Sequence, residues 1–300
     1  MNKKIMVILI IIGVFCLYMF FKNNHENNNE GGQMIISNSK IQDLTKYAYE
    51  IEEVIIKNSS KQSIYGILYK PVKENKMPAV IYSHGLGSSH NDGENYAKVL
   101  ASYGVATYCF DFRGGSSSSK SEGKTTEMSV MTEVEDLETV VDEVRKWSFI
   151  DSKKIVLLGS SQGGAVSALV SSHYQNKIAG TILLYPGFVI TDIVHETYSN
   201  INNIPETLNL MGWITVGKNY ATDVWDLDFY EEIKKDEKKI LIIHGTKDPI
   251  VPISYSERAN QTYKDSQLYK INGAGHGFNE SQFNEVMIYI LGYLQEIGII

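Results

Sequence analysis

One segment of the chain joins an apolar run to a cluster of glycine and serine. Residues 155–158 read Ile-Val-Leu-Leu, and residues 159–164 read Gly-Ser-Ser-Gln-Gly-Gly. A strand followed by Gly-x-Ser-x-Gly and a helix is typical of a strained turn that exposes a nucleophilic serine. Only Ser161 has a glycine two residues away on each side, so Ser161 rather than Ser160 is the candidate nucleophile. The glycines leave room for the neighbouring strand and helix.

A serine nucleophile needs a general base, and the base needs an acid that orients it. Asp248 lies in a turn shortly after the apolar run 240–244. His276 lies among three glycines after a further run at 267–271. In open α/β sheets, functional groups gather at the carboxyl ends of strands. The sequence therefore predicts His276 as the base and Asp248 as the orienting acid.

Other acids and histidines compete for these two roles. Three acids lie in a long connecting stretch and do not follow a predicted strand: Asp223, Asp226 and Asp228. Three histidines lack a glycine-rich setting: His25, His173 and His195. We interpret these six side chains as structural.

The tetrahedral oxyanion of acyl transfer needs two backbone N–H donors. One belongs to the residue after the nucleophile, here Gln162, and the other to the loop after the third strand. The run 79–83 predicts that strand, and residues 84–87 continue it as His-Gly-Leu-Gly. We expect the N–H group of Leu86 to be the second donor, with His84 supporting the loop through hydrogen bonds.

Eight short β-branched or aromatic runs predict the strands that must position these residues. They are 51–57, 64–70, 79–83, 105–110, 155–158, 180–185, 240–244 and 267–271. From the third onward the runs are nearly continuous in apolar residues, as in a sheet covered on both faces. Helices are expected at 129–147, 165–172 and 283–297. This alternation predicts an α/β fold with a mostly parallel sheet of about eight strands.

Residues 186–239 are more than a single crossover helix needs, so we predict an inserted lid at about 187–235. The stretch holds seven aromatic residues: Phe188, Tyr198, Trp213, Tyr220, Trp225, Phe229 and Tyr230. They either line an acyl-binding pocket or form a small core of the lid itself.

The N-terminus has a different composition. Lys3 and Lys4 precede an apolar run at 5–21, longer than the roughly 7 to 15 residues of a signal-peptide core and near the short end of a membrane-spanning helix. No Ala-x-Ala site follows. We expect residues 1–21 to be a retained single-pass anchor that leaves the catalytic domain outside the cell. If the segment is cleaved instead, the catalytic domain would be secreted. Residues 22–40 predict a flexible linker, and 41–300 one hydrolase domain.

Composition excludes several classes of function. The net charge is −7 and no long basic run occurs, which argues against a nucleic-acid partner. Of the two cysteines, Cys16 lies in the apolar run and Cys109 in a predicted strand, so no disulfide framework is expected. No His-Glu-x-x-His, cysteine pair or acidic ligand loop occurs, and we expect no metal or cofactor.

Several segments together resemble the α/β-hydrolase superfamily, and especially its cinnamoyl/feruloyl esterase-like members. They are 84–87, 111–116 (Asp-Phe-Arg-Gly-Gly-Ser), 159–164, 244–248 (His-Gly-Thr-Lys-Asp) and 275–277 (Gly-His-Gly). The order Ser161, Asp248, His276 is also the order of that fold. The resemblance implies a short lid after the sixth strand, a structural role for Arg113, and carboxylic esters as substrates. Residues 115–119 are richer in serine than the family pattern, and the lid matches no motif.

The leading hypothesis is hydrolysis of a small-molecule carboxylic ester through an acyl-enzyme. A membrane-tethered aminopeptidase or acyl-peptidase would use the same three residues, with Glu231 and Glu232 as the acidic pair for a free amino terminus. A non-catalytic binding protein that kept the fold would have lost at least one of the three, and all are present.

Overall fold

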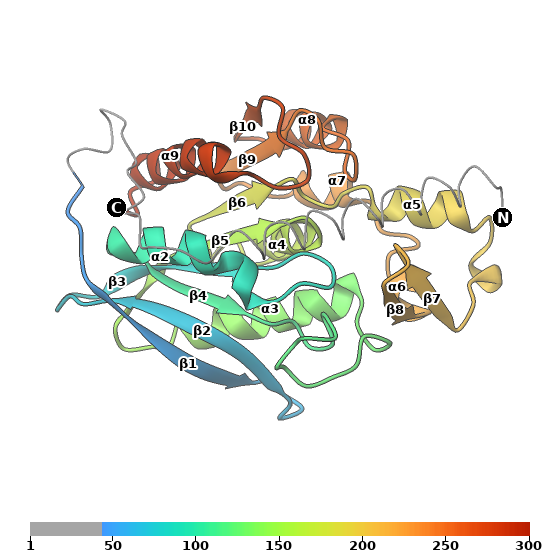
Figure 1. Ribbon diagram of the computed structural model, residues 1–300, viewed down its shortest axis with the longest axis horizontal. Helices are drawn as coiled ribbons and strands as arrows, with labels where there is room; N and C mark the ends of the chain where they lie inside the picture. Colours follow the sequence, from blue (N-terminus) through green and yellow to red (C-terminus); the bar gives the residue numbers. More distant parts are fainter. Residues whose placement is uncertain (1–43) are drawn as a thin grey trace.

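A mixed eight-stranded sheet runs through the centre of the protein (Figure 1). The computed structural model describes residues 44–300, so the predicted anchor at 1–21 and linker at 22–40 lie outside the described residues. Within residues 44–300, no helix is both long and apolar enough to cross a membrane.

The strand order is β1-β2-β4-β3-β5-β6-β9-β10. The strands are β1 (Tyr49–Lys57), β2 (Ser63–Pro71), β3 (Met77–Ser83), β4 (Ala106–Phe110), β5 (Ile150–Ser160), β6 (Gly180–Leu184), β9 (Ile240–Gly245) and β10 (Ser266–Ile271). β1 and β2 pair antiparallel with their neighbours, and every other pair is parallel. All residues of β3, β4, β6 and β9 are buried. The predicted α/β fold with a mostly parallel sheet of about eight strands is therefore confirmed.

Helices cover both faces of the sheet, as the continuous apolar strands require. α2 (Glu94–Ser102) and α9 (Glu280–Glu296) share one buried cluster with the sheet, and α3 (Val130–Val144), α4 (Gln162–His173) and α8 (Ser254–Thr262) share the other. Ser129 caps α3, because its side chain accepts a hydrogen bond from the Thr132 N–H group. The three helices expected from the sequence are present, with ends that differ by a few residues.

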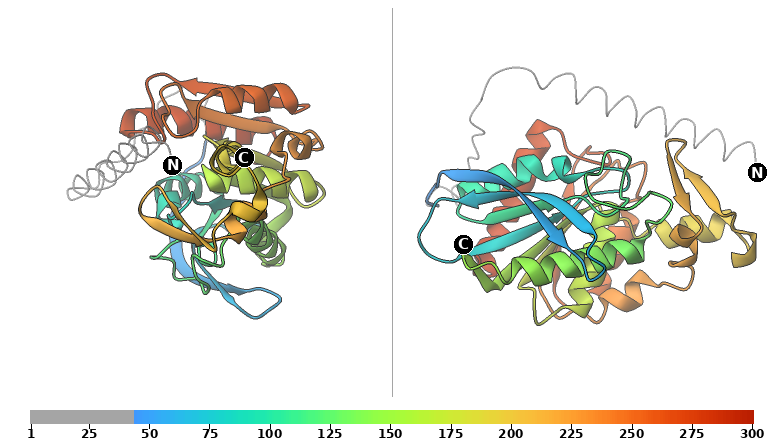
Figure 2. Two further views of the ribbon diagram at one scale, coloured as in Figure 1. Left: turned by 90° about the vertical axis from the view of Figure 1, so that its right-hand side faces the viewer. Right: turned by 90° about the horizontal axis from the view of Figure 1, so that it is seen from below.

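The inserted segment between β6 and β9 has secondary structure of its own, at one end of the molecule (Figure 2). It contains α5 (Ile190–Thr197), η2 (Ile201–Asn203), β7 (Thr207–Leu210), β8 (Ile214–Gly217), α6 (Asn219–Thr222) and α7 (Phe229–Ile233). β7 and β8 form an antiparallel hairpin joined by residues 211–213, and Met211 and Gly212 in that loop have φ values of 54° and 81°. The Trp213 N–H group donates to the Leu210 carbonyl at 3.2 Å, which closes a tight turn whose two central residues both need positive φ. We call residues 187–235 the lid.

Most of the lid's aromatic residues serve its own packing. The Phe188 ring lies 5.4 Å from that of Phe229 and 5.8 Å from that of Tyr230, and all three are buried. Trp213 differs, because it is 43% exposed and its ring covers the backbone of Gly87. The lid core accounts for the first group, and Trp213 lies beside the loop that follows β3.

Candidate active site

The turn between β5 and α4 holds Ser161 in an unusual backbone conformation. Its φ of 51° and ψ of −122° are rare for a residue with a side chain. Such a residue costs about 1–3 kcal/mol and persists only where its surroundings fix it. Here the Ser161 N–H group donates to the Leu184 carbonyl at 2.9 Å, and the Ser161 carbonyl accepts from the Gly187 N–H group at 2.8 Å. The neighbouring strand and the start of the lid therefore hold the turn.

The two glycines that flank Ser161 are required by close backbone approach. A Cβ atom at position 159 would lie 2.2 Å from the Gly163 carbonyl oxygen. A Cβ atom at position 163 would lie 2.3 Å from the carbonyl oxygens of both Ser83 and His84. The steric role assigned to these glycines from the sequence is confirmed, and α4 can begin directly against β3.

The structure brings Ser161, His276 and Asp248 together in one hydrogen-bonded line. The His276 Nε2 atom lies 2.8 Å from the Ser161 Oγ atom, and its Nδ1 atom lies 2.7 Å from Asp248 Oδ2. Asp248 follows the end of β9 and His276 follows β10, so the three groups meet at the carboxyl ends of parallel strands. In this geometry Nε2 can accept the serine proton while the carboxylate stabilises the imidazolium.

The Asp248 carboxylate is fully covered from solvent and is held by four donors. Its Oδ1 atom accepts from the N–H groups of Ile250 at 2.8 Å and Val251 at 3.0 Å. Its Oδ2 atom faces His276 and also His244, whose Nε2 atom is 3.2 Å away. Burial by itself would raise the pKa of Asp248, but the hydrogen bonds from His244 and His276 outweigh it and hold that pKa well below its usual range. The carboxylate is therefore ionised at neutral pH.

His244 and Tyr185 shape this site, and the sequence reasoning missed both roles. The buried His244 ring bonds to the Ser256 hydroxyl at 2.7 Å and the Val251 carbonyl at 2.9 Å. Tyr185 has a φ of 38°, and its ring lies 4.7 Å from the His276 ring. In the sequence, only their positions at the carboxyl ends of predicted strands could have indicated these roles. His244 is the last but one residue of β9, and Tyr185 comes directly after β6.

The proposed oxyanion donors lie beside the nucleophile. A Cβ atom at Gly85 would be 3.2 Å from the Ser161 Cβ atom, so the loop after β3 passes directly over the serine. Within residues 44–300, the N–H groups of Leu86 and Gln162 donate to no protein acceptor. Both groups are therefore free to bind a substrate oxygen.

His84 supports this loop through two hydrogen bonds, as the sequence predicted. Its Nε2 atom accepts from the Phe112 N–H group at 3.1 Å, so the proton lies on Nδ1, which donates to the Gly85 carbonyl at 2.8 Å. Burial lowers the pKa of His84 and favours this neutral form. The Gly87 N–H group also donates to the Gly115 carbonyl at 3.1 Å.

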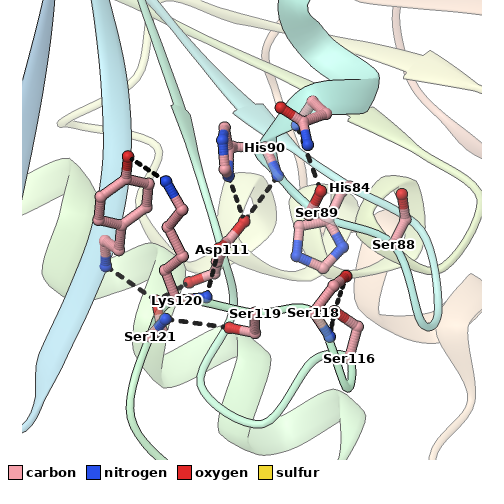
Figure 3. A network of polar contacts seen from close by, with 12 residues as sticks. His84, Ser88, Ser89, His90, Asp111, Ser116, Ser118, Ser119, Lys120 and Ser121 are labelled. Atoms are coloured by element: carbon pink, nitrogen blue, oxygen red, sulfur yellow. Dashed lines mark hydrogen bonds and ion pairs between the residues drawn. The ribbon is translucent and has the colours of Figure 1, made fainter.

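The serine-rich stretch braces the same loops (Figure 3). Buried Asp111 accepts from the N–H groups of His90 at 2.7 Å and Lys120 at 2.8 Å. The Ser121 hydroxyl donates to the Asp111 carbonyl at 2.6 Å, and the Ser119 hydroxyl donates to a neighbouring carbonyl. In this irregular segment the serine hydroxyls donate to backbone carbonyl groups that have no partner in a strand or helix of residues 44–300.

Arg113 points away from this line of residues. Its guanidinium pairs with Asp136 of α3 and with Gln62 of the loop between β1 and β2. The competing acids also lie elsewhere, since Asp223 accepts from the Ser129 hydroxyl and Asp228 caps α7. Their positions agree with the structural roles expected from the sequence.

Comparisons with known proteins agree with this architecture. The model of the family described as serine aminopeptidase, S33, matches residues 74–223, half of the chain, and a model described as alpha/beta hydrolase fold matches 196–282. The structure of Est1E from Butyrivibrio proteoclasticus with ferulic acid bound is 25% identical, with a TM-score of 0.71 over 79% of this chain and 97% of that one. Acetyl xylan esterase 1 from Thermoanaerobacterium sp. JW/SL YS485 shares the fold at 17% identity, with a TM-score of 0.60 over 83% of this chain and 87% of that one.

The matches to curated relatives cover only part of each protein's length. The uncharacterized protein YfhR of Escherichia coli O157:H7 is 24% identical over 195 residues, which is 64% of this chain and 60% of that protein. The quorum-quenching protein AidA of Acinetobacter baumannii is 29% identical over 157 residues, 52% of this chain and 48% of that protein. With half of its length matched by the family model and the α/β-hydrolase architecture in its sheet, the chain belongs to the serine aminopeptidase S33 family of α/β-hydrolases.

Proposed function

We propose that the protein is a serine hydrolase that cleaves carboxylic esters through an acyl-enzyme intermediate. The observation that carries the proposal is the unbroken line from Ser161 Oγ through His276 to the ionised Asp248, at 2.8 and 2.7 Å. Three groups in this order, at a strained turn with free N–H groups beside it, are the parts that acyl transfer requires.

The reaction follows from the positions of these groups. Ser161 Oγ attacks the ester carbonyl as His276 Nε2 takes its proton, and the N–H groups of Leu86 and Gln162 bind the oxyanion. His276 returns the proton to the departing alcohol, which leaves an ester of Ser161. Water then attacks that ester with His276 again as the base, and the carboxylic acid is released.

A second candidate, an aminopeptidase, is favoured by the description of the matching family. It needs an acidic group for the substrate's free amino terminus, close to Ser161. Glu232 lies 3.1 Å from His173 and bonds to Lys235, and Glu231 faces Lys234. His173 ends α4, about 18 Å along the helix from Ser161 at 1.5 Å per residue. The acidic pair is therefore neutralised and too distant, which supports esters over free peptides.

The descriptions of similar solved structures also support the ester proposal. Est1E has been solved with ferulic acid bound, and several similar structures are described as esterases. The ester class comes to this chain as part of the proposal, and the aromatic acid is one acyl group to test.

The test compares the full-length protein with Ser161→Ala and with Ser160→Ala as the matched control. Ser160 is the adjacent hydroxyl, which bonds to the buried Tyr82 hydroxyl at 2.9 Å. Substrates are p-nitrophenyl acetate, butyrate, octanoate and ferulate beside leucine p-nitroanilide. We expect ester turnover that Ser161→Ala lowers by up to about a millionfold in kcat and that Ser160→Ala retains. Turnover of the anilide alone would favour the peptidase, and ester turnover that survives Ser161→Ala would refute the assignment.

A further inference from the structure

A hydrogen bond joins the lid to the residue after the nucleophile. Tyr220 of α6 is 5% exposed, and its hydroxyl donates to Gln162 Oε1 at 2.6 Å. Gln162 is 2% exposed and is the first residue of α4. The bond spans 58 positions of sequence and is buried. It connects the lid directly to the turn that holds Ser161.

The remaining surroundings of the Gln162 side chain offer it little. Its Nε2 atom lies 3.7 Å from the Met128 sulfur, which is a weak acceptor. In the described part of the chain, Tyr220 is the one hydrogen-bond donor to Oε1. Leaving a buried amide oxygen without a donor costs about 1–3 kcal/mol. The Tyr220 hydroxyl is therefore what holds the Gln162 side chain in place.

A buried acid lies beside this pair. Glu133 of α3 is 1% exposed, and within residues 44–300 neither of its carboxyl oxygens has a hydrogen-bond partner. Burial raises the pKa of Glu133 well above its usual range, with the Gln162 amide opposing that rise and the Asp136 charge adding to it. The Gln162 side chain therefore bonds to the Tyr220 hydroxyl on the lid side and lies near the buried Glu133 carboxyl of α3.

Resting on the proposed function, we propose that Tyr220 is a positioning residue for the oxyanion site. Its hydroxyl fixes the Gln162 side chain and, through it, the direction of the Gln162 N–H group beside Ser161. The strained Ser161 backbone makes this support necessary, because the first turn of α4 begins on a residue with a φ of 51°. Docking of the lid and stabilisation of the oxyanion are thereby coupled through one hydrogen bond.

Tyr220→Phe removes that bond and keeps the ring. Tyr263→Phe is the matched control, because Tyr263 is equally buried and its hydroxyl has no hydrogen-bond partner in the described residues. With p-nitrophenyl butyrate and the full-length protein, we expect Tyr220→Phe to lower kcat by roughly three- to tenfold, the range of one hydrogen bond. KM should change less than about twofold, and Tyr263→Phe should leave both constants unchanged.

Two further readouts separate positioning from a structural role. Binding of a phenylboronic acid, whose tetrahedral Ser161 adduct resembles the transition state, should weaken by the same factor as kcat. Gln162→Ala keeps the backbone N–H group but removes the acceptor, so adding Tyr220→Phe to it should cause no further loss of kcat. If Tyr220→Phe does not fold, Gln162→Ala alone should show the same loss of kcat.

The proposal is overturned by a lowered Tm with unchanged kcat, by a raised KM with unchanged kcat, or by losses that add independently in the double variant. The proposed function is tested separately, because Ser161→Ala must abolish ester turnover whatever Tyr220→Phe does.

Discussion

Replacement of Asp248 by asparagine tests the hydrogen bonds that join Ser161, His276 and Asp248. The structure predicts a large loss of activity from this single change. Asp248 Oδ1 accepts from two backbone N–H groups, so the asparagine oxygen will take that place. The asparagine NH₂ group then replaces Oδ2 and faces His276 Nδ1 and His244 Nε2. Because two donors repel, His276 must move its proton to Nε2, and Nε2–H cannot accept the proton of Ser161.

The size of the effect follows from that exchange of tautomers. In a serine hydrolase triad the same substitution lowers kcat by about 10⁴, which is about 5.5 kcal/mol at 1.36 kcal/mol per tenfold change. We expect a similar loss for Asp248→Asn in hydrolysis of p-nitrophenyl butyrate at pH 7.5. KM should change little, because the Asp248 carboxylate is covered from solvent and bonds to His276, which lies between it and Ser161.

The matched control is Asp226→Asn, an exposed acid of the lid with the same change of charge. It should retain nearly full activity. Circular dichroism and Tm report whether Asp248→Asn still folds. A folded Asp248→Asn protein with more than about a hundredth of the original kcat would refute the role of Asp248.

Three further outcomes follow from other parts of the chain. Gly163→Ala should destabilise the protein by about 3 kcal/mol or more in urea unfolding, because its Cβ atom would lie 2.3 Å from the Ser83 carbonyl, whereas Gly292→Ala, which meets no neighbour within 4 Å, should not. Because burial raises the pKa of Glu133, its contribution to stability falls as pH rises above the unfolded value of about 4.3, so Glu133→Gln should raise Tm more at pH 8 than at pH 4. The apolar run 5–21 should keep the full-length product in the membrane fraction of cells, and a shortened soluble product alone would argue against the anchor.

The parts of the site that the sequence predicted are those that depend on local backbone geometry. Gly159 and Gly163 predict close backbone packing around Ser161. The structure shows which carbonyl groups would collide with a side chain at position 159 or 163. The central strands were predicted because each is an apolar run buried on both faces. Such features depend on neighbours within a few residues, and their signal is therefore visible in the sequence alone.

The parts that were missed depend on contacts between distant segments. α8 has a polar sequence, Ser-Tyr-Ser-Glu-Arg-Ala-Asn-Gln-Thr, and only its Ser256 and Ala259 are buried. The hairpin of β7 and β8 is short, and its pairing is supported from outside by the Thr125 hydroxyl, which donates to the Thr215 carbonyl at 2.6 Å. No periodicity within either segment predicts these partners.

Ser129 joins the lid to the start of α3. Its hydroxyl oxygen accepts from Thr132 N–H to cap α3, and its proton is donated to Asp223 of the lid at 2.6 Å. A hydroxyl has one proton to donate, so displacing the lid removes the partner of that proton at the start of α3. Glu133 lies in the first turn of the same helix, and its carboxyl is near the Gln162 amide that Tyr220 also contacts. The lid is therefore hydrogen-bonded at two places, to Gln162 through Tyr220 and to the start of α3 through Asp223. Any displacement of the lid would break both of these hydrogen bonds.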